Sequence, residues 1–168
     1  LLGYCIEQPA RHGLGVHPAL WSGSCLSDLV GARVIDGLRL RVGDVLPRYR
    51  AADAWRAAGL SPGGIAPMAI ERVRGVGLAA LRDAAAFAAC AHPTLDGRSS
   101  RETRARAAVV QIGREAGFRQ GDVAAVLGFS TEAARKLGHR QLEPALRRAV
   151  LLRLGIVAAL ADPNLRTR

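Results

Sequence analysis

Apolar residues recur at helical spacing through much of the chain after residue 66. Between residues 67 and 90 they lie three to five positions apart, at Ile70, Val73, Leu78, Leu81 and Ala85. This spacing places them along one face of an α-helix and predicts a helix over the stretch. Similar patterns, bounded by glycine, serine or proline, predict four more helices, over about 101–116, 120–127, 130–137 and 143–160.

The first sixty residues show weaker patterning. Residues 1–12 are typical of a helix end, and Pro9 is expected to stop or kink that helix near Gln8. Residues 51–58 predict a short helix ended by Gly59. Residues 33–42 alternate weakly, which is compatible with a short strand or an irregular arm.

Proline and glycine crowd residues 61–66, which are therefore the predicted linker. We expect a mainly α fold with an irregular N-terminal part over 1–60, a helical domain over 67–160 and a tail over 161–168. Ser100 is the expected N-cap of the helix that follows the loop 92–100, because Glu102 lies in the first turn.

The most informative stretch is residues 120–137, QGDVAAVLGFSTEAARKL, which has the pattern of a helix-turn-helix. Its apolar set occupies one face of each predicted helix and comprises Val123, Leu127, Phe129, Ala134 and Leu137. Gly128 falls where the chain must turn, with a positive φ expected, and Ser130 is placed to cap the second helix. Two short helices joined in this way are typical of a unit that lays its second helix in the major groove of DNA.

The polar residues of the second helix fit contact with DNA. The residues expected to face outward are Ser130, Thr131, Glu132, Arg135, Lys136 and His139. Arg135 is suited to a guanine edge, while Thr131 and Lys136 are suited to phosphate or base. Gly138 is expected to end the helix before His139. The alternative is a plain helical hairpin with a solvated charged face.

Charge supports a polyanionic partner. The formal net charge is +10, and Lys136 is the only lysine among the cations. Four arginines crowd the start of the predicted helix before the helix-turn-helix and are expected to clamp the DNA backbone: Arg98, Arg101, Arg104 and Arg106. Arginine enrichment can also come from genomic bias. From Arg98 to His139 the chain resembles the DNA-binding domain of the bacterial replication initiator, where a basic helix precedes a helix-turn-helix.

The remaining sequence features do not alter the predicted fold or function. The three cysteines are far apart and have no zinc-binding spacing, so reduced thiols are expected. The longest uncharged run is shorter than the roughly 20 apolar residues that a membrane span needs, and no secretory signal opens the chain. A cytoplasmic protein without a membrane partner is the default expectation. Leu1 in place of a start methionine suggests either that the natural chain has lost its N-terminal part or that this sequence is a piece of a longer protein.

The opening stretch, GYCIEQPARHGLGVHPALWSGS, resembles the REP-associated tyrosine transposases of the HUH single-strand family. The positions in step with that family's pattern are Tyr4, Gln8, Pro9, Arg11, Gly13, Leu14, Pro18, Trp21 and Ser24. The resemblance implies that residues 1–60 are a remnant of an α+β nuclease domain. It makes Tyr4 the match of the catalytic nucleophile and Gln8 the match of an amide metal ligand.

This chain departs from that family in its histidines. The family's His-apolar-His pair is missing, because His12, His17, His92 and His139 are far apart. We therefore expect the chain alone to be inactive and to need no cofactor, although the complete enzyme would use Mg²⁺ or Mn²⁺.

The predicted function is that of the DNA-binding part of a transposase, which acts on REP-like or insertion-element DNA as duplex or hairpin. The first alternative is a stand-alone helix-turn-helix transcriptional regulator, which would be a homodimer with its surface on residues 143–160. The second is a helical interaction module that binds no nucleic acid.

Overall fold

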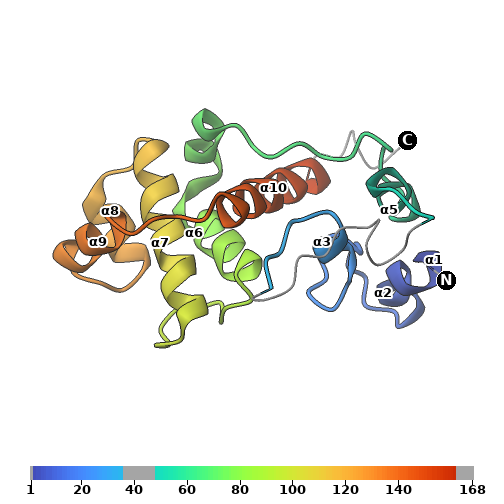
Figure 1. Ribbon diagram of the computed structural model, residues 1–168, viewed down its shortest axis with the longest axis horizontal. Helices are drawn as coiled ribbons and strands as arrows, with labels where there is room; N and C mark the ends of the chain where they lie inside the picture. The colour runs from blue at the N-terminus through green and yellow to red at the C-terminus, as the bar shows by residue number, and fades with distance from the viewer. Residues whose placement is uncertain (1, 36–47, 162–168) are drawn as a thin grey trace.

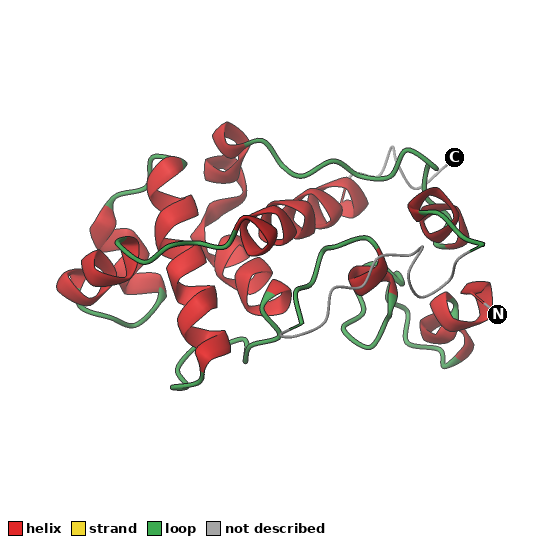
Figure 2. Ribbon diagram, in the orientation of Figure 1, coloured by secondary structure: helices red, strands yellow, loops and turns green. Residues whose placement is uncertain are grey.

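The computed structural model describes residues 2–35 and 48–161 (Figure 1). Within these ranges the regular elements are helices and no strand is formed (Figure 2), which confirms the mainly α fold. The helices are α1 (Leu2–Ile6), α2 (Gln8–Arg11), α3 (Leu26–Leu29), α5 (Ala51–Ala57), α6 (Ile70–Ala88), α7 (Ser100–Glu115), α8 (Gln120–Val126), α9 (Thr131–Gly138) and α10 (Pro144–Ala161).

The predicted helices form where the apolar spacing places them, with two local differences. Ser99, not Ser100, caps α7: its Oγ accepts a hydrogen bond from the Glu102 amide at 3.3 Å, and Ser100 is already helical. Helix α6 is interrupted at Gly77, whose φ of 87° and ψ of 164° are not helical. Most of the expected strand or arm over 33–42, and the tail after residue 161, lie outside the described residues.

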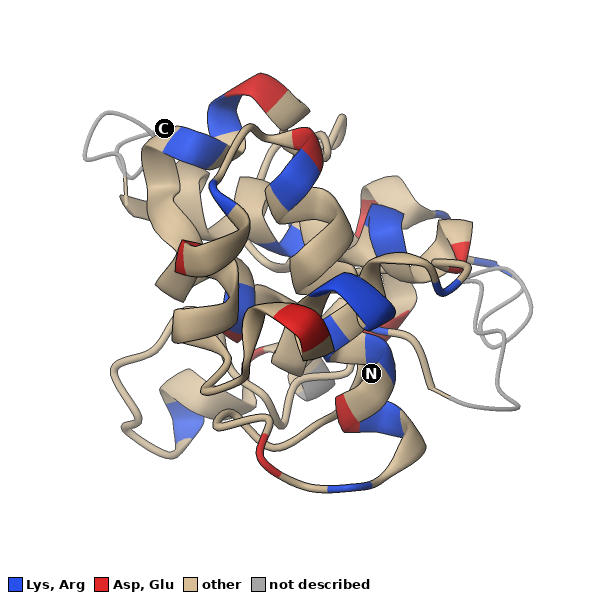
Figure 3. Cartoon of the chain, turned by 90° about the vertical axis from the view of Figure 1, so that its left-hand side faces the viewer, with Lys and Arg blue, Asp and Glu red and all other residues tan. Residues whose placement is uncertain are grey.

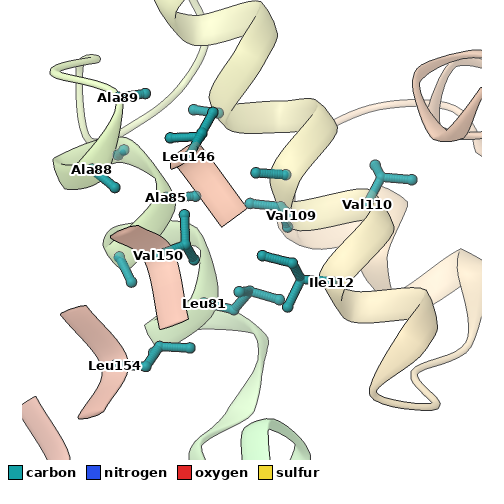
Figure 4. Close-up of a cluster of buried hydrophobic side chains, with 14 of the residues drawn as sticks. Leu81, Ala85, Ala88, Ala89, Val109, Val110, Ile112, Leu146, Val150 and Leu154 are labelled. Carbon is teal, nitrogen blue, oxygen red and sulfur yellow. The ribbon is translucent and has the colours of Figure 1, made fainter. Parts of the chain in front are cut away.

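The main core lies where α6, α7 and α10 pack together (Figure 4). Side chains from all three helices point into the space between them: Leu81 and Ala85 from α6, Val109 and Ile112 from α7, and Leu146, Val150 and Leu154 from α10. Many of its buried residues are alanines, so the three helix backbones can approach closely.

A second apolar cluster joins the N-terminal part of the chain to the far half of α10. Ile6 and Leu26 are completely buried in it, and Trp55 of α5 is 6% exposed. Leu152 and Ile156 of α10 belong to the same cluster. Helix α10 therefore contributes to both clusters, with α8 and α9 at one end of the molecule and α1, α2 and α5 at the other (Figure 1).

Candidate nucleic-acid interface

Helices α8 and α9 pack against each other and against α7, and so form a helix-turn-helix on a rigid support. The residues facing inward are buried: Val123 and Ala124 on α8, Leu127 after it, and Ala134 on α9. Ala134 has no exposed surface, which fixes which face of α9 is turned to the core. The apolar set predicted from sequence therefore does hold the unit together, with Phe129 and Leu137 partly buried beside it.

The turn between the two helices forms as its residues predict. Gly128 has a φ of +67°, a conformation that costs glycine little. Ser130 then caps α9, since its Oγ accepts a hydrogen bond from the Ala133 amide at 3.2 Å. Gln120 adds a contact not expected from sequence, because its Nε2 donates to the Thr131 carbonyl at 3.1 Å and ties the start of α8 to the start of α9.

The predicted outward residues of α9 are at the surface. Exposed side chains are found at Ser130, Thr131, Glu132, Arg135, Lys136 and His139. Helix α9 ends at Gly138, as expected, and His139 is its C-cap. The opposite face of the same helix is closed by Ala134, so these side chains form the face that a partner would meet.

The exposed face of α9 carries an ion pair between Arg135 and Glu132. Arg135 donates two hydrogen bonds to the Glu132 carboxylate, from Nε and Nη2, each 2.9 Å long. Hydrogen bonding from Arg135 lowers the pKa of Glu132, and the same pair raises the pKa of Arg135. Both groups are therefore charged at neutral pH, and Glu132 partly neutralises the arginine predicted to read DNA.

The four arginines expected to clamp DNA divide into two kinds. Arg98 and Arg101 are exposed at the start of α7. Arg104, with 23% of its side chain exposed, pairs with Glu143 at 2.8 Å. The Arg106 guanidinium lies 5.0 Å from the centre of the Phe129 ring and donates to the Leu95 carbonyl at 3.2 Å. Arg104 and Arg106 thus make contacts within the chain, and the sequence had no signal for their partners.

The end of the molecule that carries α8 and α9 mixes the two charges. Figure 3 views the chain from this side and shows lysine and arginine interspersed with aspartate and glutamate. Basic and acidic residues are therefore both present at this end, and the net charge of +10 is that of the whole chain.

Tyr4 and Gln8 lie close together at the other end of the molecule. Gln8 Nε2 donates to the Tyr4 carbonyl at 2.9 Å, and the Tyr4 side chain is 55% exposed. The Arg11 guanidinium lies 4.7 Å from the centre of the Tyr4 ring. The two residues belong to successive helices, α1 and α2, since the helix breaks at Glu7 just before Pro9.

These residues do not fit the divalent ion that the resemblance implies. Gln8 Oε1 lies 3.2 Å from His12 Nε2, and an amide with one imidazole falls short of the donors that such an ion needs. Over residues 2–35 and 48–161 no three histidine, cysteine or acidic side chains come together as a metal site.

In the described part of the chain, no helix has both the length and the apolar character needed to span a membrane. Comparisons of the chain with protein-family models, with curated proteins and with solved structures gave no match.

Proposed function

We propose that this chain binds DNA through the helix-turn-helix of α8 and α9, with the exposed face of α9 in the major groove. The observation that carries the proposal is the division of α9 into two faces. Ala134 is fully buried against the supporting helices, while Thr131, Arg135 and Lys136 are exposed on the other side. Such a division is what a recognition helix requires.

The rest of the unit supports this orientation. Gly128 and Ser130 fix the angle and the start of α9, so its outward side chains are held on a rigid element. Arg98 and Arg101, exposed at the start of α7, are suited to phosphate contacts beside the groove. In this proposal Arg104 and Arg106 position their neighbours, since each is already engaged within the chain.

The resemblance of residues 1–24 to REP-associated transposases suggests the biological setting. We propose that the helix-turn-helix holds such an enzyme on its element or on structured repeats. Cleavage by this chain alone is not part of the proposal, because Tyr4 and Gln8 lack the histidine pair of that family.

A dimeric regulator receives less support, because it would need an apolar face on α10. The apolar residues of this helix are largely used inside the chain: Leu146, Ala149, Val150, Leu151, Leu152, Leu154, Ile156 and Leu160 are all buried. Val157, at 39% exposed, is an exception.

Selection from a random duplex library, followed by fluorescence anisotropy across a salt series, tests the proposal. Affinity should fall steeply between about 50 and 200 mM salt, because bound phosphates release counterions. Lys136→Ala should weaken binding and reduce the salt slope by about one. Arg72→Ala removes an exposed charge on α6 and should change neither. Binding that ignores salt, or equal effects of the two variants, would refute DNA binding by α9.

Titrations against hairpin DNA, asymmetric duplexes and two-fold duplexes separate the two settings. A hairpin or asymmetric element end bound by one chain supports the transposase setting. A two-fold site bound by two chains at fixed half-site spacing supports the regulator.

A further inference from the structure

A cavity of about 490 Å³ is lined by residues of α7, α8 and α9, several of which are exposed. Its volume is within the range of roughly 300–1,000 Å³ that small-molecule sites occupy in proteins. Val110 on α7 and Gly138 on α9 line it, and Val123 of α8 and Ala134 of α9 lie behind them, almost completely buried. The ring of Phe118, half-buried in the connection between α7 and α8, completes the apolar wall.

Positive charge lies beside this apolar wall. Arg114 and Arg135 both line the cavity, and both residues are exposed. No aspartate or glutamate is among the described residues that line it. Glu115, next to Arg114 in sequence, is bound instead to Arg147 at 2.7 Å. Arg135 is held by Glu132, so Arg114 is the cation better placed to receive a new anion.

We propose that this cavity binds a small aromatic carboxylate, with its ring against Phe118 and the aliphatic wall and its carboxylate on Arg114. An apolar enclosure with a few polar groups at one side is the usual form of a small-molecule site. The planar guanidinium suits a carboxylate, since it can donate two parallel hydrogen bonds. Arg135 lines the same cavity and also lies on the proposed DNA-binding face, so a bound ligand would lie beside that face. That consequence rests on the proposed function, whereas binding itself does not.

The test uses the full chain without DNA, so its outcome is independent of whether the protein binds nucleic acid. The probes are 1-naphthoate and its neutral analogue 1-naphthamide, titrated into labelled protein and followed by amide chemical shifts. We expect 1-naphthoate to shift the signals of Val110, Val123 and Ala134 in a saturable manner. The amide should bind at least roughly tenfold more weakly, because it lacks the charged partner for Arg114.

Two variants locate the site. Arg114→Ala should weaken 1-naphthoate roughly tenfold, while Arg72→Ala, which removes an exposed arginine outside the cavity, should leave affinity unchanged. Gly138→Leu should abolish binding, because a Cβ on Gly138 already lies 3.4 Å from Val110 and a longer side chain would fill the space. Its folding is checked by circular dichroism, and Arg114→Ala tests the site even if that variant unfolds.

Several outcomes would overturn the proposal. One is that 1-naphthoate causes no saturable shift in the signals of the cavity residues. Another is that 1-naphthoate and 1-naphthamide bind with equal affinity. A third is that Arg114→Ala and Arg72→Ala change the affinity for 1-naphthoate equally. Concentration-dependent broadening of the same signals without a probe, together with a dimer in sedimentation, would show that a second copy of the chain occupies the cavity instead.

Discussion

At the scale of single residues, arginine has several distinct roles in this chain. Arg153 of α10 lies 3.7 Å from the centre of the Phe87 ring and donates hydrogen bonds to the Ala19 and Leu20 carbonyls, at 2.6 and 3.0 Å. Burial, and then the charge of Arg33, lower the pKa of Arg153 to about 10, so the group is still charged at neutral pH. It therefore connects the N-terminal part of the chain to α10 and α6.

We predict that Arg153→Met lowers the free energy of unfolding by about 2–3 kcal/mol, because the Ala19 and Leu20 carbonyls lose their charged donor. Arg148→Met, at an exposed position of the same helix, should change it by less than about 0.5 kcal/mol. Urea denaturation of the two variants measures the difference. Similar losses from both would contradict the role given to Arg153.

A second residue-scale prediction concerns Glu132 and depends on the proposed function. Glu132→Gln should raise affinity for DNA several-fold, since it removes a negative charge facing phosphate and releases Arg135 from its ion pair. Glu71→Gln changes net charge equally but lies on α6, so it should have little effect. Anisotropy titrations at one salt concentration compare them. An unchanged or lower affinity for Glu132→Gln would argue against α9 as the DNA-binding element.

At the scale of elements, one glycine defines the turn of the helix-turn-helix. A Cβ at Gly128 would meet no atom within 4 Å, yet its φ is +67°. The cost of a side chain there is therefore conformational and not steric.

Gly128→Ala should accordingly destabilise the protein by about 1 kcal/mol. Gly121→Ala is a matched control, because Gly121 lies in α8, has no positive φ and also has open space around its Cβ position. That change should be neutral or stabilise by up to about 1 kcal/mol. Urea denaturation measures the change in the free energy of unfolding for both variants. An equal loss from Gly121→Ala and Gly128→Ala would show that the positive φ at Gly128 does not determine the turn.

The start of α7 offers a test of the corrected cap. Ser99→Ala should cost about 1 kcal/mol, because the Glu102 amide loses its acceptor. Ser100→Ala should cost little, since Ser100 is inside the helix, where alanine is favoured. Thermal melts of the two variants measure this difference. A larger loss of thermal stability for Ser100→Ala would indicate that Ser100 is the N-cap, as predicted from the sequence.

At the scale of the whole molecule, α10 is the element that joins its two apolar clusters. Leu154 lies in the cluster shared with α6 and α7, while Ile156, two residues later, lies in the cluster shared with α1, α3 and α5. Loss of either cluster would expose apolar surface on the same helix. The two parts of the chain are therefore expected to unfold together.

We predict that Ile156→Ala lowers stability by about 2–5 kcal/mol and that unfolding remains a single transition. Tryptophan fluorescence follows Trp21 and Trp55, both in the N-terminal part of the chain, and far-ultraviolet circular dichroism follows mainly the longer helices α6, α7 and α10. The two signals should change at the same urea concentration in the wild type and in the variant. Separate transitions would instead support the division into residues 1–60 and 67–160.

Local patterns in the amino-acid sequence are sufficient to predict the local features of this protein. Helix positions, the turn at Gly128 and the cap at Ser130 depend on residues within four positions of each other, so apolar spacing and residue type were sufficient to place them. The exposed face of α9 followed from the same spacing, because a helix with a buried Ala134 must turn Arg135 and Lys136 outward.

Contacts between residues that are distant in sequence depend instead on how the helices pack. This packing brings Arg106 to Phe129, Arg153 to Phe87 and the two clusters to α10, and it leaves a cavity lined by residues of α7, α8 and α9. No local pattern encodes these contacts, since they depend on how whole helices pack and on which side chains then compete for the same space. The same packing engages Arg104 and Arg106 in contacts within the chain, while Arg98 is exposed at the start of α7.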